Sequence, residues 1–188
     1  MLFRFLLIFV CLNSSSLIAQ QSPQLKFWNS LSLHCGKSYE GKLITTPEPK
    51  DFKDKLLTIH FFQCSDSVIR VPLVVGDNRS RTWVFTLLEE GIQLKHDHRH
   101  EDGSEDKVTQ YGGSTSNTGF DNLQYFPADQ ETANLIPYAA GNIWWVTVND
   151  STLTYNLRRI NSDKPISIEF DLTKPVDPPK KPWGWQSH

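Results

Sequence analysis

The sequence predicts an all-β domain in which antiparallel strands form a meander that closes, or nearly closes, into a barrel of about eight to ten strands. Short runs rich in β-branched and aromatic residues recur along the 188 residues, separated by Gly, Pro, Asn, Asp or Ser, and no long helical period appears. Consecutive antiparallel strands leave edges that must be hidden, and closure of the meander hides them. A two-layer sandwich of the same strands is the alternative.

Residues 1–20 are expected to be a signal peptide that is removed on export. The segment has Arg4 near its start, continues through the apolar run Phe5–Leu12 and ends on small residues near Ala19. This apolar run is too short to span a bilayer, and no second candidate span follows it. The mature chain is therefore expected in a secreted or periplasmic space.

Residues 21–174 are expected to form one barrel-like domain that begins with a short helix. Phe27, Trp28, Leu31 and Leu33 are spaced as on one helical face over Leu25–Leu33. The predicted strands are Tyr39–Thr45, Leu56–Cys64, Val68–Val75, Arg81–Leu88, Ile92–His100, Asn142–Asn149, Leu153–Arg159 and Ile166–Leu172.

Two regions give weaker signals. Residues 111–138 are rich in Gly, Asn and Pro, and we expect loops there with one or two short strands. Residues 175–188 form a Pro/Trp-rich tail, which should not continue a central strand because proline lacks the backbone N–H. We expect Trp183 and Trp185 to pack against the barrel.

The two cysteines of the mature chain predict a disulfide. Cys11 leaves with the signal peptide, and Cys35 and Cys64 then form an even pair in an exported protein. In the chain-entropy model such a bridge is worth about 3 kcal/mol. Two buried free thiols are the alternative.

The charge distribution argues against nucleic acid as a partner. The chain carries 19 Lys and Arg against 21 Asp and Glu, a formal net charge of −2. Apart from one acidic cluster near residues 101–106 and a basic pair at Lys180-Lys181, the charges are interspersed. No basic patch is present to attract a polyanion.

The most informative segment, Lys95–Gly103, has histidines at alternate positions. In a strand, residues two apart share a face, so these side chains should line one side of the sheet. A two-residue turn at Glu90-Gly91 would face them inward and leave the opposite polar face, Gln93 to Glu101, in water. The predicted cross-strand pairs are Phe85 with His96, Trp83 with His98, and Arg81 with His100.

This cluster predicts a ligand-binding site for a small polar or anionic molecule. Arginine presents a fixed fork for carboxylate or phosphate, histidines add hydrogen bonds, and Trp144 or Trp145 would add apolar walls. The predicted ligand-binding residues are His96, His98, His100, Arg79, Arg81 and Trp83.

Three alternatives stay open. Imidazoles bind divalent transition metals, so His96, His98 and His100 are candidate metal ligands. A histidine positioned by Asp97, Glu101 or Asp102 would serve acid–base catalysis, although no covalent nucleophile can be named, and enzyme activity is left open. A satisfied internal network of polar side chains would only fix the fold, as in a structural or interaction domain.

Several motifs resemble those of a family of exported bacterial proteins of unassigned function. They are Gly76–Trp83 (GDNRSRTW), Leu94–Gly103 (LKHDHRHEDG), Tyr111–Gly113 (YGG) and Phe126–Asp129 (FPAD). The resemblance covers nearly all of the mature chain and implies a bacterial envelope location, but no activity. A further resemblance to lipocalin-type barrels depends on an early tryptophan, Trp28, followed by a meander, and it implies a barrel with room for one small ligand.

Overall fold

The computed structural model describes residues 21–45, 49–160 and 162–185, so the predicted signal peptide, residues 1–20, lies outside the described residues. The helices are α1 (Pro23–Ser32), α2 (Gln130–Leu135) and the 3₁₀ helix η1 (Pro137–Ala139). The strands are β1 (Ser38–Leu43), β2 (Leu57–His60), β3 (Gln63–Cys64), β4 (Val68–Val75), β5 (Asn78–Leu88), β6 (Gly91–His98), β7 (Tyr111–Ser114), β8 (Leu123–Pro127), β9 (Asn142–Val148), β10 (Thr152–Arg159) and β11 (Ile166–Val176).

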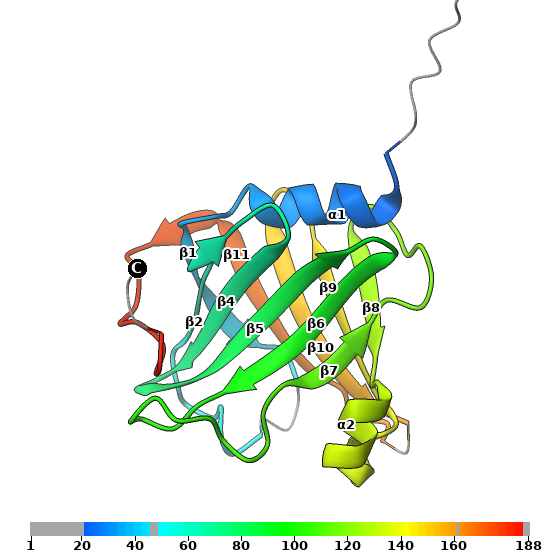
Figure 1. Ribbon diagram of the computed structural model, residues 1–188. Helices are drawn as coiled ribbons and strands as arrows, with labels where there is room; N and C mark the ends of the chain where they lie inside the picture. The colour runs from blue at the N-terminus through cyan, green and yellow to red at the C-terminus, as the bar shows by residue number, and fades with distance from the viewer. Residues whose placement is uncertain (1–20, 46–48, 161, 186–188) are drawn as a thin grey trace, which may run out of the picture.

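The strands form one antiparallel sheet that curls into a nearly closed barrel, which confirms the predicted fold class (Figure 1). Their order is β7-β6-β5-β4-β2-β1-β11-β10-β9-β8, and the short β3 pairs with β4. The two ends of this order approach each other where the amide of Asp129 donates to the carbonyl oxygen of Gly112 at 2.9 Å. A Cβ at Gly113 would collide with the carbonyl oxygen of Pro127, so glycine permits this close approach.

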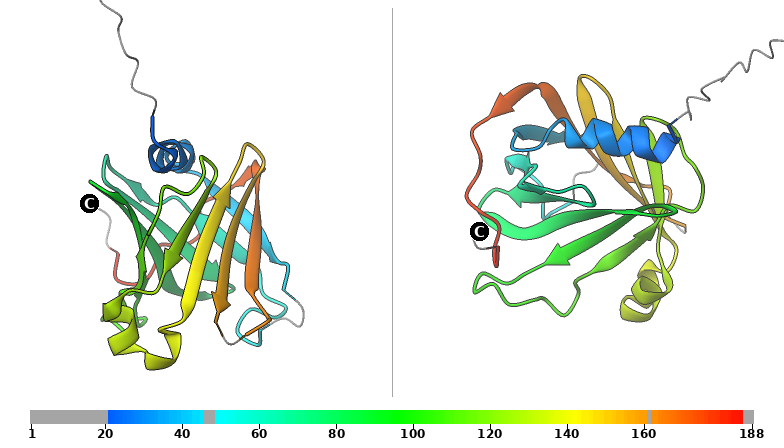
Figure 2. Two further views of the ribbon diagram at one scale, coloured as in Figure 1. Left: turned by 90° about the vertical axis from the view of Figure 1, so that its right-hand side faces the viewer. Right: turned by 45° about the horizontal axis from the view of Figure 1, so that its top comes forward.

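Helix α1 lies across one end of the barrel, and α2 lies at the other end (Figure 2). The Ser22 hydroxyl caps α1 by accepting from the amide of Leu25 at 3.2 Å. Phe27, Trp28 and Leu31 are buried as predicted. The prediction for Leu33 was wrong: this residue follows the last turn and its side chain is 73% exposed.

The space beneath α1 is filled by apolar side chains from the inner faces of the strands. Phe27 and Leu31 of the helix belong to the same buried cluster as these strand residues. Strand residues of this cluster include Ile69, Val71, Phe85, Ile92, Leu94, Phe126, Val146, Val148, Leu153 and Phe170, each no more than 2% exposed. This end of the barrel is therefore a packed core.

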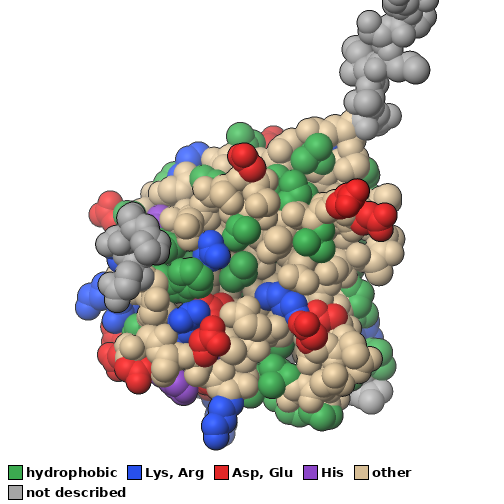
Figure 3. All heavy atoms as spheres, in the orientation of Figure 1, with side chains coloured by type: hydrophobic (Ala, Val, Ile, Leu, Met, Phe, Trp, Pro, Cys, Tyr) green, Lys and Arg blue, Asp and Glu red, His purple; other side chains and the backbone are tan. Residues whose placement is uncertain are grey.

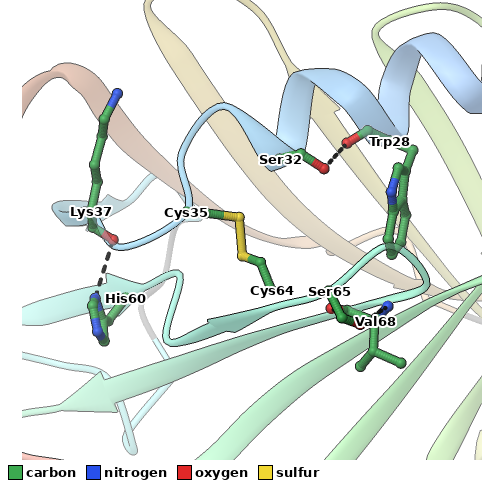
Figure 4. Close-up of a disulfide and its surroundings, with 8 residues drawn as sticks. All are labelled: Trp28, Ser32, Cys35, Lys37, His60, Cys64, Ser65 and Val68. Atoms are coloured by element: carbon green, nitrogen blue, oxygen red, sulfur yellow. Dashed lines mark hydrogen bonds between the residues drawn. A yellow bond between two sulfur atoms is a disulfide. The ribbon is translucent and has the colours of Figure 1, made fainter.

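The predicted disulfide between Cys35 and Cys64 is confirmed, with a Cα–Cα distance of 6.1 Å. Figure 4 shows that it joins the chain leaving α1 to β3. Two backbone hydrogen bonds lie beside it, from Gly36 to the Phe61 carbonyl and from Phe61 to the Lys37 carbonyl, each 2.9 Å. The bridge thus fastens the helix to the barrel at the closed end.

Several predicted strand limits were wrong. Leu56–Cys64 divides into β2 and β3, and β11 continues beyond Leu172 to Val176. Pro175 pairs with Tyr39 after a shift of register between Tyr39 and Gly41, so this proline lies past an irregularity rather than inside a regular ladder. Region 111–138 contains the two short strands β7 and β8, in line with the one or two that the sequence predicts. It also contains α2 and the start of η1, which the sequence did not predict.

The β5–β6 hairpin turns one residue earlier than predicted. Leu88 pairs with Gly91, which places Glu89 and Glu90 in the turn. The partners are therefore Arg81 with His98, Trp83 with His96, and Phe85 with Leu94. This slip of two residues preserves which side chains share a face, because the side-chain period of a strand is two.

Charged side chains are scattered on the face formed by β4–β7, where Lys, Arg, Asp and Glu are interspersed (Figure 3). No helix within the described ranges has both the length and the apolar character needed to cross a membrane.

Candidate functional site

A cavity of about 240 Å³ lies at the end of the barrel away from α1. Its walls combine aromatic and aliphatic side chains with two arginines and two histidines. Tyr138 and Val108, 69% and 42% exposed, lie where the cavity meets solvent. The lining residues are Phe52, Leu73, Arg81, Thr82, Trp83, His96, His98, Val108, Tyr111, Ile136, Tyr138, Ala139, Asn142, Trp144, Tyr155, Leu157, Arg159, Ile166 and Ile168.

The floor of the cavity is a contact between opposite walls of the barrel. The rings of Trp83 on β5 and Tyr155 on β10 stack with centroids 4.2 Å apart and an interplanar angle of 12°. His96 on β6 joins them, because its Nε2 lies 2.7 Å from the Tyr155 hydroxyl. These three side chains separate the cavity from the apolar core beneath α1.

His96 is fixed in one neutral tautomer. Its Nδ1 donates to the carbonyl oxygen of Tyr111 at 3.0 Å, because a carbonyl only accepts. Nε2 is then the acceptor for the Tyr155 hydroxyl. Burial lowers the pKa of His96 to about 3, although the hydrogen bond to the Tyr111 carbonyl raises it, and the charge of Lys95 adds a smaller lowering effect.

His98 lies two residues nearer the mouth. Its Nε2 is 3.0 Å from the Tyr111 hydroxyl, whose ring in turn stacks on His96 with centroids 4.7 Å apart. Burial and then the charge of Arg81 lower the pKa of His98 to about 4. Burial also raises the pKa of Tyr111 to about 12, so both imidazoles and the phenol are neutral near pH 7.

The two arginines of the cavity come from opposite walls. Arg81 on β5 donates from Nη1 to Asn78 at 3.2 Å, and its Nη2 is 4.0 Å from the exposed carboxylate of Asp51. Arg159 on β10 donates from Nε to Asn142 at 3.1 Å and lies over the Tyr138 ring, 4.9 Å from its centroid. Both guanidinium groups line the cavity on the side nearer its mouth than the Trp83–Tyr155 floor.

The structure brings four of the six predicted ligand-binding residues to this cavity: Arg81, Trp83, His96 and His98. His100 lies beyond the end of β6 and is exposed. Arg79 instead donates from Nη1 to the Lys181 carbonyl at 2.8 Å and lies 5.9 Å from the centroid of the Trp183 ring. Of the two proposed apolar walls, Trp144 lines the cavity and Trp145 does not.

The expectation that the opposite face of β6 sees water was wrong for Asp97 and Lys95. Asp97 is 1% exposed and accepts from Arg99 Nε at 2.9 Å and from Trp185 Nε1 at 3.1 Å. Trp185 also contacts two guanidinium groups, because Arg70 and Arg99 are 4.7 and 5.2 Å from its ring centroid. The C-terminal tail therefore covers this face.

Lys95 is buried for a different reason. Its Nζ lies 2.6 Å from Asp129 and 2.8 Å from Glu131, at the start of α2. Hydrogen bonds and charge from these carboxylates raise its pKa, although burial alone would lower it. Lys95 thus fastens α2 to β6.

Sequence reasoning missed the partners that complete the site, namely Tyr111, Tyr155 and Arg159. Tyr155 lies in the predicted strand Leu153–Arg159, but nothing in the sequence identified what it faces. Tyr111 and Arg159 lie at strand ends, where no pattern in the sequence links them to His98 or Arg81.

The three histidines do not converge on a point. His100 is exposed outside the cavity, and both ring nitrogens of His96 have protein partners. Across residues 21–45, 49–160 and 162–185, no group of three or more His, Cys, Asp or Glu side chains is arranged to hold a metal ion. The carboxylate of Asp97, predicted to orient a histidine, bonds to Arg99 and Trp185 instead.

Comparisons of the chain with family models, with curated proteins and with solved structures found no match.

Proposed function

We propose that this protein binds a small organic molecule in the cavity at the open end of its barrel. The observation that carries the proposal is a 240 Å³ space bounded by aromatic rings and by hydrogen-bonding side chains. Binding sites for small molecules commonly pair mostly apolar walls with a few polar groups that fix orientation. Since such sites usually measure about 300–1,000 Å³, the ligand should be small.

Arg81 is the polar group that favours a ligand over a purely structural role. A guanidinium has five N–H donors, and within the described residues only the Nη1 bond to Asn78 uses one of them. The carboxylate of Asp51, the partner that the described residues provide, is 79% exposed and 4.0 Å away. A ligand acceptor in the cavity would satisfy donors that the protein leaves available.

A structural network is the second candidate, and a specific contact favours it. Both ring nitrogens of His96 are satisfied by Tyr111 and Tyr155, as a polar network that only fixes the fold would require. We propose that His96 and Tyr155 stabilise the fold at the floor of the cavity, while Arg81 and His98, nearer the mouth, contact the ligand.

Filling the cavity tests the proposal. Leu157→Trp places a large ring inside the space, whereas Arg158→Trp adds the same ring on the exposed outer face of the same strand. A set of small organic probes, hexanoate, hexanol, benzoate and benzyl alcohol, would be titrated calorimetrically against the three proteins. We expect binding by the native chain and by Arg158→Trp but not by Leu157→Trp. Equal binding by Leu157→Trp, or binding of no probe to the native chain, would refute the proposal.

We further propose that the chain is exported to a bacterial envelope or extracellular space. The signal-like pattern at residues 1–20 and the family resemblance support this location, and the Cys35–Cys64 disulfide fits an oxidising compartment. Expression of the full chain in a bacterium should yield a secreted or periplasmic product shortened near Ala19, measured by intact mass. An uncut cytoplasmic product would contradict it.

A further inference from the structure

From the charges around the cavity we infer that its ligand is a small monocarboxylate whose carboxylate lies against Arg81 and whose apolar body lies among Trp144, Leu157 and Ile168. This inference rests on the proposed function, since it names the chemical class that the same cavity would take. It adds that the ligand carries one negative charge, which the proposed function does not require.

The described part of the cavity wall carries positive charge and no acidic side chain. Among the described lining residues two are arginines, and none is Asp or Glu. The two buried imidazoles add no charge, because burial keeps both neutral at pH 7. A cationic ligand would therefore face Arg81 and Arg159 with no acidic side chain among the described lining residues to attract it, whereas an anion would find attraction from both walls.

Arg81 is the group best placed to bind the anion. Its side chain is 23% exposed, so a charge-assisted hydrogen bond there is shielded from water more than one at the surface would be. Among the described residues Asp51 is the carboxylate paired with it, at 4.0 Å and 79% exposed, which makes that pair weak. The planar guanidinium fork matches the two oxygens of a carboxylate.

The distance along β5 between Arg81 and the Trp83–Tyr155 floor determines where the head group and the apolar body of the ligand would lie. Arg81 precedes Trp83 by two residues on β5, a rise of about 7 Å along a strand. Arg81 also pairs with His98, so the Nε2 of His98 and the Tyr111 hydroxyl lie at the same level of the wall. A carboxylate at this level would leave the apolar body against Trp144, Leu157 and Ile168, all in the same cavity wall.

The number of charges favours a monoanion. One half-buried guanidinium compensates one negative charge, and Arg159 is exposed at the rim, where solvent weakens its attraction. A phosphate monoester, close to a dianion at pH 7, would bring a second charge into a wall whose histidines stay neutral. The size of the cavity also favours the smaller headgroup.

The test compares three probes that share a body and differ in head group. Hexanoate, hexanol and hexylamine would be titrated calorimetrically at pH 7 and low salt against the native protein. We expect hexanoate to bind at least about tenfold more tightly than hexanol, the difference that one charge-assisted hydrogen bond provides, and hexylamine to bind most weakly. Binding of hexanol or hexylamine as tight as that of hexanoate would overturn the inference and leave the proposed function intact.

Substitution identifies the arginine responsible. Arg81→Gln should reduce hexanoate affinity to that of hexanol and leave hexanol unchanged, whereas Arg79→Gln, which alters an arginine outside the cavity, should leave the tenfold preference in place. Arg81→Lys keeps the charge without the fork, and it should give an intermediate preference if Arg81→Gln does not fold. A preference unchanged in both Arg81 variants would overturn the assignment to Arg81, and failure of every probe to bind would overturn the proposed function as well.

Discussion

Beneath α1, β5 and β6 present Phe85 and Leu94 to a core packed against Phe27, whereas at the opposite end the same two strands present Arg81 and His98 to a cavity. The inner face of each strand thus changes from apolar side chains to polar ones part-way along its length. The Trp83–Tyr155 stack, with His96 beside it, lies at this change. One end of this barrel therefore provides most of the stability, and the other end is free to hold polar groups and open space.

A large-to-small substitution at each end gives the largest expected contrast. Phe27→Ala removes a fully buried ring from the core and should lower the free energy of unfolding by about 3–5 kcal/mol. Leu157→Ala enlarges a cavity that already exists and should cost about 1 kcal/mol, since Leu157 is only partly buried. Urea unfolding of both variants measures this difference. Equal losses of unfolding free energy would contradict the view that the closed end provides most of the stability.

Loss of the disulfide should also weaken the closed end. The double variant Cys35→Ser/Cys64→Ser frees a chain segment with a sequence separation of 29, which should lower the free energy of unfolding by about 3 kcal/mol. Because the bridge lies beside α1, hydrogen exchange should accelerate first in α1 and β3. Faster exchange that starts instead at β7 or α2 would show that the bridge stabilises the open end rather than the closed end.

Acid should destabilise the protein through the histidines of the open end. The folded pKa of His96 is about 3, below its unfolded value near 6.5, so the unfolded chain binds more protons between these values and stability falls as pH decreases. Between pH 7 and pH 5 this amounts to about 2 kcal/mol for His96, and His98 contributes with the same sign. Unfolding measured at several pH values should therefore give a smaller slope for His96→Asn than for the native chain. An unchanged slope in His96→Asn would mean that His96 is not buried in its neutral form.

The smallest effect concerns the bond at the floor. Tyr155→Phe keeps the stack on Trp83 but removes the hydroxyl that donates to His96, so Nε2 loses its partner. We expect a loss of about 1–2 kcal/mol and a change in the ¹⁵N shift of that nitrogen. No change in the ¹⁵N spectrum of His96 would show that this hydrogen bond does not form.

Strand periodicity explains why so much of the fold could be predicted from the sequence. Alternation placed His96 and His98 on the inner face, and it tolerated a hairpin slip of two residues because the phase is the same. What failed depends on contacts between distant segments. Asp97 was expected in water, but its carboxylate is buried among donors that include Gln110 and Trp185, the latter 88 residues away.

The candidate site was predictable only in part for the same reason. Arg81, Trp83, His96 and His98 come from one hairpin, whose pairing is local. Tyr111 comes from β7, which pairs with β6 only after a long loop, and Tyr155 and Arg159 come from β10, which closure of the barrel brings near. No local pattern in the sequence specifies either approach. His100 failed as a cavity residue because β6 ends at His98 and the alternation ends with it.

The indole N–H signals of the protein test the central claim most directly, because the two ends carry different tryptophans. Trp83 and Trp144 line the cavity, while Trp28 is a buried residue of α1 at the closed end. In a ¹H–¹⁵N NMR titration with hexanoate, assigned by Trp→Phe substitution, we expect the Trp83 and Trp144 signals to shift and saturate while the Trp28 signal stays in place. Shifts confined to Trp28, or no saturable shift at Trp83 and Trp144, would contradict a ligand site at the open end of the barrel.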